Sequence, residues 1–493
     1  MSHPPSPAAL LLGSVAGAMA PAPPLLPAQG TTLAEAVAAL AAARSSAVLA
    51  VDGGGRPVGI LTEQDVARRV TFRLPPETPL AAAMTAPVIA CGASDGLWRA
   101  VALMRAHHLR HLPVLGPDGA PIGMLHRAET LAAASGRLLG HLDALGAAED
   151  AAVKRAQAGV AAALLAEGVP APEVVALVGE VNLDLHRRVA MRALAAQQGP
   201  PPVGFTLLVM GSAGRGESLL RPDQDNALIL GGYGDAEHDR IDAWFRGFAE
   251  ALNTGLDAAG FPLCPGGVMA RNPLWRKRLP EWEAQFALWA RRRSGAALLF
   301  ADIAFDFRAC ASIDSAGRLA AADAAPAAPA ARLRLTLTRL LAEVPALLAA
   351  LAQQNAALRV GLTFWGGFAD DEPGAGARTD LKLHGLMPLV AAARLAALQR
   401  GVAETGTVAR LDGLAAAGTI TAGEAARLRE AFGVLLGAVL RQQLEDAAAG
   451  RTPGNLVDTA SLRREERVRL RDALRAVRGF AGTTIAGFTG QLW

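Results

Sequence analysis

The order of hydrophobic and polar positions repeats itself in the first third of the chain. Two apolar runs of strand length flank a Gly- and Pro-rich turn at residues 48–61, and the same arrangement returns at residues 112–125. The two copies stay in register at a spacing of 64 residues, so that Gly55 matches Gly119. Because solenoid repeats recur every ~20 to 50 residues, this longer spacing predicts two copies of one small α/β unit. Helical patterns precede the copies, at residues 33–43 and 97–107.

Further helical patterns follow the second copy. Between residues 138 and 198 apolar residues recur three and four positions apart, as on one face of a helix, with a proline-containing break at 170–172. Gly199-Pro-Pro-Pro202 ends this pattern, and short aliphatic runs of strand length begin after it. The sequence therefore predicts a helical connector and then a new domain.

The remainder of the chain divides at an Ala- and Pro-rich segment, residues 321–331, which we interpret as a linker. A length of 493 residues, against ~150 for an average domain, also favours several domains. We expect an α+β multidomain fold. Its parts are the repeated α/β pair at 20–135, the helical connector at 138–198, a domain with a mixed sheet at 200–320 and a C-terminal helical domain at 332–490.

Composition narrows the class of protein. Apolar residues make up 52% and charged residues 19% of the chain, which excludes wholesale disorder. The net charge is only +3 over the whole length, so we expect no nucleic-acid partner. The three cysteines, Cys91, Cys264 and Cys310, lie far apart without CxxC spacing. This pattern supports neither a disulfide framework nor a zinc site, and it fits a reducing cytoplasm.

The N-terminus contains an apolar stretch, residues 8–20, whose end at Ala18-Met19-Ala20 resembles a signal-peptidase site. Residues 1–7 contain no Lys or Arg, however, whereas a secretory leader normally begins with positive charge. No other stretch reaches the ~18 uninterrupted apolar residues that span a bilayer. We therefore expect a soluble cytoplasmic protein with no membrane partner.

Candidate chemistry lies at the start of the third part. The apolar run at residues 205–210 predicts a strand and is followed at once by Gly211 and Ser212, and a second predicted strand runs from Asp223 to Leu230. On a strand, Asp223 and Asp225 point to the same side about 6.6 Å apart. Two carboxylates at that spacing can hold Mg²⁺ or Mn²⁺. Gly211 allows backbone N–H groups to approach a triphosphate, and the Ser212 hydroxyl adds a donor.

Other residues are weaker candidates. Arg215 and Glu217 shape the loop after Ser212 or contact phosphate. Lys382 is one of only three lysines in a chain that otherwise uses Arg, which favours a nucleotide contact. Cys264 and Trp275 fit core packing better than an acceptor contact. The runs Arg276-Lys-Arg278 and Arg291-Arg-Arg293 fit solvated helix faces better than phosphate sites.

The repeated unit resembles the CBS domain, which normally occurs in pairs and often binds adenine nucleotides between the copies. The string from Gly59 to Asp65 fits the family pattern, which implies that Thr62 contacts phosphate and Asp65 the ribose. The second copy has His126 and Glu129 at these two positions, so the resemblance implies one nucleotide site. Thr62 followed by Asp65 also fits a helix-capping box, which needs no ligand. Both interpretations stay open.

Residues 205–230 resemble the polymerase-β-like nucleotidyltransferase superfamily, whose mark is Gly-Ser followed by Asp-x-Asp. The ten residues between Ser212 and Asp223, including Gly214-Arg215-Gly216-Glu217, are similar to the branch that contains bacterial PII-protein uridylyltransferases and CBS-bearing signal-transduction relatives. The resemblance implies a polymerase-β-like mixed sheet in the third part and a substrate-binding helical bundle in the fourth. Further similar blocks are Cys264–Pro273 with Trp275, Phe305–Arg308, Arg378–Lys382, Thr407–Leu411 and Gly454-Asn455.

Two departures from that branch limit what the resemblance implies. The superfamily usually supplies a third carboxylate from a later strand, but the matching strand expected near Gly266–Met269 carries none. Asp302 and Asp306 are only distant substitutes. Full-length uridylyltransferases also remove the nucleotide with a separate His-Asp metal domain, and only His384 follows the transferase segment here. A reversing hydrolase is therefore not expected.

These patterns together predict a Mg²⁺-dependent nucleotidyltransferase. It would transfer a uridylyl or adenylyl group from an NTP to a hydroxyl, on a protein acceptor, under regulation by a nucleotide at the CBS pair. We also expect a homodimer. The alternative from a different class is a non-catalytic nucleotide-sensing regulator with a degenerate transferase domain.

Overall fold

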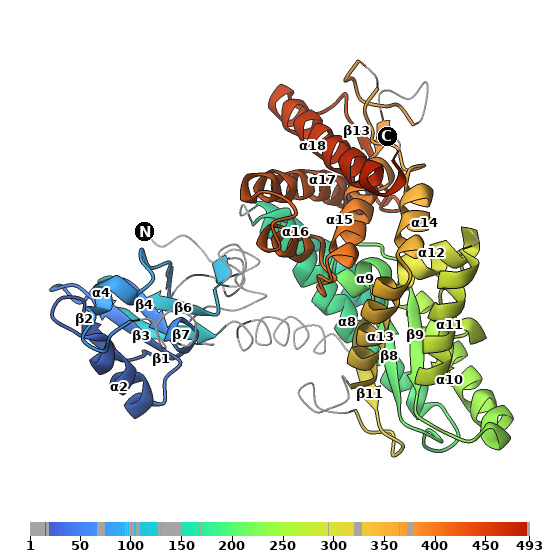
Figure 1. Cartoon of the computed structure of the whole chain (residues 1–493), viewed down its shortest axis with the longest axis horizontal. Helices are drawn as coiled ribbons and strands as arrows, with labels where there is room; N and C mark the ends of the chain where they lie inside the picture. The colour runs from blue at the N-terminus through green and yellow to red at the C-terminus, as the bar shows by residue number, and fades with distance from the viewer. Residues whose placement is uncertain are drawn as a thin grey trace. The chain divides into compact units, whose positions relative to one another are not determined.

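The computed structural model describes residues 15, 19–66, 74–93, 95, 97, 100, 103–104, 109–126, 130, 150–166, 169–293, 295–319, 328–363, 365–371 and 378–490. The chain forms two compact units, residues 1–146 and 147–493, and each is described by itself (Figure 1).

The first unit contains two copies of one strand–turn–strand motif. The strands are β3 (Ala47–Val51) and β4 (Pro57–Thr62) in the first copy, and β6 (His111–Leu115) and β7 (Pro121–His126) in the second. Each pair is antiparallel and has a register shift at the same relative place. Each turn contains a glycine with positive φ, +79° at Gly55 and +82° at Gly119, where a side chain would be strained. The repeat predicted from the sequence is thus confirmed.

Short strands and helices complete the two copies. The sheets have the strand orders β2-β3-β4 and β1-β7-β6-β5. Helix α2 spans Leu33–Ala43 as predicted, and it begins at a capping box made by Thr32 and Glu35. Most of the second predicted helix, 97–107, lies outside the described residues. The remaining elements are β1 (Ala20–Pro21), β2 (Leu25–Pro27), β5 (Cys91–Gly92), α3 (Glu63–Asp65) and α4 (Leu80–Ala83).

The second unit begins with helices α7 (Asp150–Ala166) and α8 (Ala171–Ala195), which the periodicity predicts, with a break at the predicted proline segment. A four-stranded sheet follows, in the order β10-β9-β8-β11. Strand β10 runs parallel to β9, and the other pairs are antiparallel, so the sheet is mixed. The strands are β8 (Phe205–Val209), β9 (Asn226–Leu230), β10 (Arg276–Arg278) and β11 (Arg308–Ile313).

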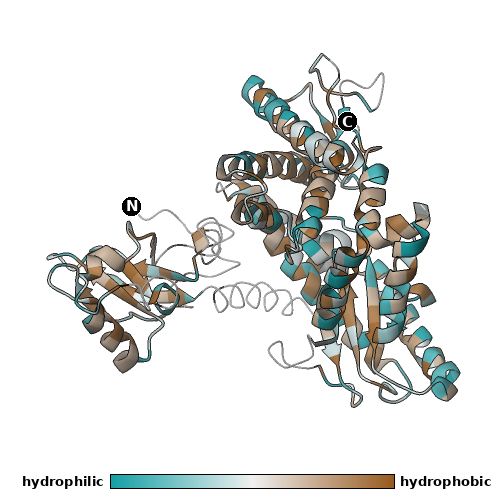
Figure 2. Cartoon of the chain, viewed as in Figure 1, coloured by the Kyte–Doolittle hydropathy of each residue, from teal (hydrophilic) through white to brown (hydrophobic). Residues whose placement is uncertain are grey.

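Helices cover both faces of this sheet, so every residue of β8 and β9 is buried. This explains why both strands are continuous apolar runs rather than alternating ones. On one face Phe205 packs against Phe245 and Phe248 of α10 (His238–Ala258), which also contacts α8. On the other face Leu208 and Ile229 share a core with α11 (Leu279–Arg292), α12 (Gly295–Ala304) and α13 (Ala328–Glu343). Figure 2 shows hydrophobic residues on the strands and hydrophilic ones on the outer helices.

The remaining elements of the second unit are mainly helical. Those around the sheet are α9 (Gly211–Arg215), η3 (Asp235–Glu237) and η4 (Pro273–Trp275). The C-terminal ones are α14 (Pro345–Asn355), β12 (Arg378–Asp380), η6 (Lys382–Leu386), α15 (Met387–Gln399), α16 (Thr407–Ala416), α17 (Ala422–Ala448), β13 (Leu456–Asp458) and α18 (Arg464–Thr489). Helix α15 has ten consecutive buried residues and packs against α14, α16 and α18.

Several local predictions were wrong. The second strand begins at Asn226, and Asp223 and Asp225 precede it. The neighbouring side chains of Gln224 and Asn226 form hydrogen bonds with the backbone of residues 261 and 270. Residues 266–269 do not form a strand, and the next strand of the sheet is β10. Its Arg276 is buried against Asp242 rather than on a solvated helix. The predicted linker at 321–331 is helical from residue 328 onward.

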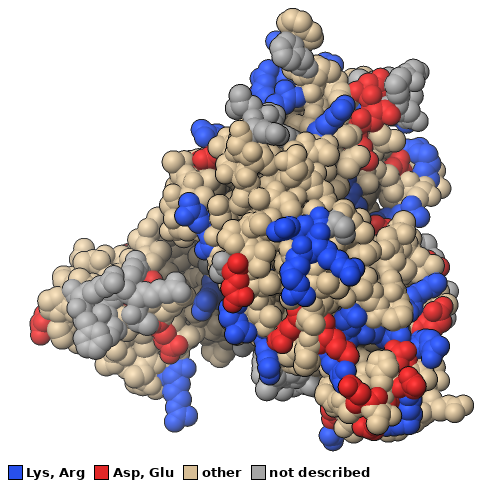
Figure 3. Space-filling view, turned by 45° about the vertical axis from the view of Figure 1, so that its right-hand side comes forward, with Lys and Arg blue, Asp and Glu red and all other residues tan. Residues whose placement is uncertain are grey.

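Two further observations concern the surface and membranes. Figure 3 shows Lys and Arg interspersed with Asp and Glu on the face that it presents. Among the described residues, no single helix is long and apolar enough to cross a membrane. One sharply bent pair, Pro329–Leu341 and Pro345–Asn355, meets the length and composition test only when the two helices are taken together.

Candidate functional site

The second unit contains a cavity of about 330 Å³ between the β8–β9 loop and several helices. The loop supplies Gly211, Ser212, Arg215, Glu217, Leu219, Arg221, Pro222, Asp223 and Asp225. The other lining residues are Leu299, Asp302 and Ile303 of α12, Gln354, Asn355 and Leu358 at the end of α14, Lys382 to Arg394 at intervals along η6 and α15, and Phe432 and Leu436 of α17. Seven residues predicted from the sequence therefore line one cavity: Gly211, Ser212, Arg215, Glu217, Asp223, Asp225 and Lys382.

Two glycines of this loop allow close approaches that a side chain would block. Gly211 has φ +57°, and a Cβ there would lie 2.8 Å from Oδ2 of Asp225. A Cβ on Gly214 would lie 1.9 Å from the carbonyl oxygen of Asp306, well inside contact distance. The backbone N–H of Met210 also donates to the carbonyl of Asp225 at 2.9 Å. The Gly-Ser turn, the aspartates and the end of α12 are thus packed against one another.

The two aspartates are held by the residues that alternate with them. Gln224 and Asn226 are fully buried, whereas Asp223 and Asp225 line the cavity. The amide of Asn253 on α10 donates to Oε1 of Gln224 at 2.8 Å and to Oδ1 of Asn226 at 3.0 Å. Gln224 in turn donates to the carbonyl oxygen of residue 261 at 2.8 Å. This buried polar network fixes the backbone that presents both carboxylates.

The electrostatics of the aspartates reflect their surroundings. Burial raises the pKa of Asp225 to about 6, and the nearby Asp223 charge adds to this effect. A hydrogen bond from the Cys264 thiol and the charge of Lys382 act in the opposite direction. Burial and the Asp225 charge raise the pKa of Cys264 to about 11, so its thiol remains protonated as a donor. Among the described residues, no group of three or more His, Cys, Asp and Glu side chains could hold a metal ion.

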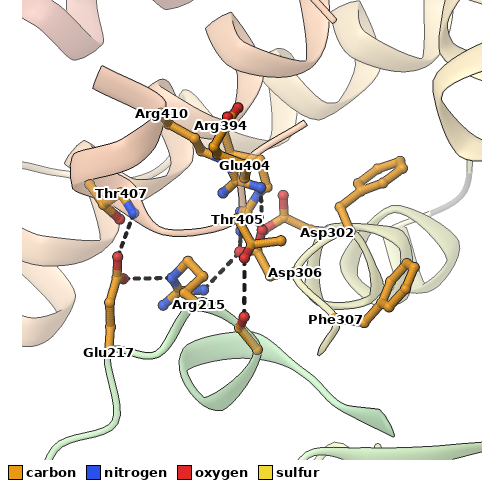
Figure 4. A network of polar contacts seen from close by, with 12 residues as sticks. Arg215, Glu217, Asp302, Asp306, Phe307, Arg394, Glu404, Thr405, Thr407 and Arg410 are labelled. Atoms are coloured by element: carbon orange, nitrogen blue, oxygen red, sulfur yellow. Dashed lines mark hydrogen bonds and ion pairs between the residues drawn. The ribbon is translucent and has the colours of Figure 1, made fainter. Parts of the chain in front are cut away.

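A buried charge network lies beside the cavity (Figure 4). Asp306 is fully buried, and its carboxylate accepts from Arg215 at 2.8 Å and from Arg394 and Arg410 at 2.6 Å each. Burial alone would raise the pKa of Asp306, but the three guanidinium groups hold it far below its usual value. Arg394 also binds Asp302. The Asp306 carboxylate is therefore fully engaged in ion pairs with the three arginines, whereas Asp302 lines the cavity.

The same network ties the loop to the C-terminal helices. Glu217 accepts from the Arg215 side chain at 2.8 Å and from the backbone N–H of Thr407 at 2.5 Å. The hydroxyl of Thr405 donates to the carbonyl of Gly214 at 3.2 Å. Both walls of the cavity are thus joined by charged and neutral hydrogen bonds.

Sequence reasoning missed Arg394, Gln354 and Asn355, and it included Arg410 only within the block Thr407–Leu411. Arg394 did leave a signal, because it is the only charged residue in α15. A lone charge in an otherwise apolar and buried helix needs a buried partner. Nothing in the sequence distinguished Gln354 and Asn355 from ordinary helix-end residues.

The predicted CBS residues lie in the first unit. Oγ1 of Thr62 accepts from the backbone N–H of Asp65 at 3.2 Å, and the Asp65 carboxylate accepts from the Thr62 backbone at 3.0 Å. The capping box is therefore present. His126, which replaces Thr62 in the second copy, packs edge-on against His111 at 5.1 Å between ring centroids. Glu129 lies outside the described residues.

Comparison with protein families places known domains on these segments. Residues 15–71 and 80–136 match the CBS domain, residues 155–296 match "Putative nucleotidyltransferase DUF294", and residues 345–485 match "Putative nucleotidyltransferase substrate binding domain". The protein is thus of a multidomain class in which CBS domains are combined with a nucleotidyltransferase-type domain. The chain belongs to the CBS-containing DUF294 family.

Individual relatives match only part of the chain. An uncharacterized protein of Methanocaldococcus jannaschii is 33% identical over 82 residues, which cover 16% of this chain and 20% of that protein. The chain thus spans about a fifth of the length of this curated relative.

Solved structures match the chain over about a quarter of its length. A CBS domain protein from Pyrobaculum aerophilum complexed with AMP is 25% identical, with 24% of this chain and 88% of that one covered and a TM-score of 0.22. A CBS-domain protein from Agrobacterium tumefaciens is 22% identical, with 24% and 98% covered and a TM-score of 0.21. Since both TM-scores are below 0.5, the CBS assignment rests on the family match and the repeat.

Proposed function

We propose that this protein is a Mg²⁺-dependent nucleotidyltransferase that moves a uridylyl or adenylyl group from an NTP to a hydroxyl on a protein. The observation that carries the proposal is the cavity, which gathers the Gly211-Ser212 turn, Asp223, Asp225 and Lys382 from segments far apart in the chain. The loop residues fall within the match to the nucleotidyltransferase domain, and Lys382 falls within the match to the substrate-binding domain.

The donor set fits a hard divalent cation. Asp223 and Asp225 offer carboxylate oxygens, the ligands that Mg²⁺ prefers, and the Asn253 network holds their backbone in place. When bound, the ion would neutralise charge on the transferring phosphoryl group. Ser212, Arg215 and Lys382 would bind and orient the triphosphate from the surrounding wall.

The transfer itself exchanges one P–O bond for another. The acceptor hydroxyl oxygen bonds to the α-phosphorus, and the bond from that phosphorus to the bridging oxygen breaks, which releases pyrophosphate. We assign the hydroxyl proton to Asp302, because its Oδ1 has no hydrogen-bond partner and burial raises its pKa. Asp306 is unsuited to this role, since three arginines hold it ionised.

The first unit would regulate this activity. We propose that an adenine nucleotide binds at Thr62 and Asp65, which the family pattern assigns to phosphate and ribose. In this proposal Asp65 would exchange its capping hydrogen bonds for the ribose hydroxyls.

Transfer of label tests the proposal. The purified protein is incubated with each α-labelled NTP, Mg²⁺ and cell lysate, and the labelled acceptor is located. We expect the double variant Asp223→Asn, Asp225→Asn to lose Mg²⁺-dependent labelling and to keep its fold. Asp223 is exposed, where a charge contributes little to stability, and Asp225→Asn removes a carboxylate whose charged form burial disfavours. Undiminished labelling by the folded variant would refute the metal assignment. Nucleotide binding without any turnover would favour the non-catalytic sensor instead.

A further inference from the structure

Three buried polar atoms without hydrogen-bond partners belong to residues that line the cavity: Oδ1 of Asp302, Oε1 of Gln354 and Nδ2 of Asn355. Buried polar atoms in folded proteins almost always have partners, so each exception needs an explanation. Asn355 is only 5% exposed, so bulk water does not readily satisfy its amide. A molecule bound in the cavity is one source of partners for these atoms.

Gln354 and Asn355 form one feature at the C-terminal end of α14. Each is a primary amide, which offers both a donor and an acceptor. One unpartnered acceptor and one unpartnered donor therefore stand on adjacent residues of the same wall. Gln353, the preceding residue, is exposed and does not line the cavity.

The rest of this wall is apolar apart from Asp302 and Arg394. It is built by α12, α15 and α17, with Leu299, Ile303, Val390, Phe432 and Leu436 among its residues. The charged lining residues come instead from the β8–β9 loop, from Lys382, and from Asp302 and Arg394, which bind each other. A flat, largely apolar group with one polar edge would suit the apolar wall, since its faces would contact carbon and its edge would meet the amides.

We propose that Gln354 and Asn355 recognise the base of the nucleotide through a donor–acceptor pair. This inference rests on the proposed function, because it assumes that the triphosphate binds along the β8–β9 loop. Every nucleobase presents a donor next to an acceptor on its polar edge, in an order that differs between bases. Two amides fixed on one helix end complement one order better than the other. Base choice is therefore made by the C-terminal segment and not by the Gly-Ser and Asp-x-Asp residues.

Binding to Leu variants tests this assignment. All proteins carry Asp65→Ala, so that the proposed CBS site contributes nothing, and each is titrated calorimetrically with the four NTPs and with inorganic triphosphate, which has no base. We expect the unmodified pocket to bind one or two NTPs about tenfold or more tightly than the others. Gln354→Leu and Asn355→Leu should reduce that spread to less than about threefold while inorganic triphosphate binds as before. Gln353→Leu is the matched control and should change nothing.

The thermal midpoint of the ligand-free protein supplies a second measurement. Because each Leu removes an unpartnered buried polar atom from a side chain that lines a cavity, neither variant should lower the midpoint. An unchanged ranking and spread of the four NTPs in both folded variants would overturn the inference, as would equal affinity for all four NTPs in the unmodified pocket. If neither inorganic triphosphate nor any NTP binds, the proposed function itself fails, and the two failures are thereby distinguished.

Discussion

Four consecutive residues, Asp223 to Asn226, divide their side chains between the cavity and the interior. The sequence predicted which two would share a face, because an extended chain alternates whether or not it belongs to a sheet. It did not predict that Asn253, 27 positions after Asn226, would hold the other two. Such a partner cannot be inferred from spacing, since it depends on how α10 packs against the loop.

Lys154 is a second residue whose environment could not be predicted from the sequence. Its ammonium donates to the amide oxygens of Gln157 at 3.1 Å and Asn182 at 2.7 Å, and it lies 4.4 Å from the centre of the Phe261 ring. These hydrogen-bond partners are neutral. Burial lowers the pKa of Lys154 to about 7.

This shift gives the folded protein a specific pH dependence. Between pH 7 and the ordinary lysine pKa of 10.5, the unfolded chain binds a proton at Lys154 that the folded chain does not, so stability rises with pH. We expect Lys154→Met to remove this rise when unfolding midpoints are compared from pH 7 to pH 9. Above pH 9 the buried thiol of Cys310, with its pKa raised to about 12, contributes the opposite slope. A wild-type slope that persists unchanged in Lys154→Met would contradict the assignment.

Asp306 connects elements that the sequence suggested only as separate blocks. The carboxylate follows α12 and binds arginines from α9, α15 and α16. The strands β8 and β9 and most helices could be predicted, because burial on one or two faces leaves a periodic pattern. The network could not, since its members are 88 to 104 positions from Asp306 along the chain.

Removing the charge of Asp306 should destabilise the second unit strongly. Asp306→Asn keeps the shape but leaves three guanidinium groups with too little negative charge in a buried place, at a cost of about 3–5 kcal/mol. Asp472→Asn is the control, because its ion pair with Arg475 is 60% exposed on both sides and is worth at most about 1 kcal/mol. Urea unfolding of both variants compares the two costs. Similar losses would show that the arginines find other partners.

The proposal also links the two units of the chain through nucleotide binding. If a nucleotide at Thr62 and Asp65 alters the transfer rate, it must bind two states of the protein with different affinity. If it changes the affinity for NTP, then NTP must change the affinity for the CBS ligand by the same factor. We expect an adenine nucleotide to bind about once per chain and to change the transfer rate. Asp65→Ala should abolish both effects in titrations with ATP, ADP and AMP.

A matched control separates ligand binding from helix capping. Glu35→Ala removes the equivalent carboxylate of the capping box at α2, away from the family's phosphate and ribose positions. It should cost about the same stability as Asp65→Ala, on the order of 1 kcal/mol, and leave nucleotide binding intact. Absence of binding in the unmodified chain, or binding that survives Asp65→Ala, would reduce Thr62 and Asp65 to a helix cap.

The division of the cavity between two segments limits which segments a gene of this family can lose or exchange. Its loop comes from the segment that matches the nucleotidyltransferase domain, and most of its remaining wall comes from the segment that matches the substrate-binding domain. A gene that lost the first segment would encode a site without its Gly-Ser and Asp-x-Asp residues. A gene that lost the second would leave Asp306 without Arg394 and Arg410. These two segments should therefore be inherited as one unit. The CBS pair has hydrophobic clusters made only of its own residues, so recombination can replace it with another sensor and leave the cavity intact.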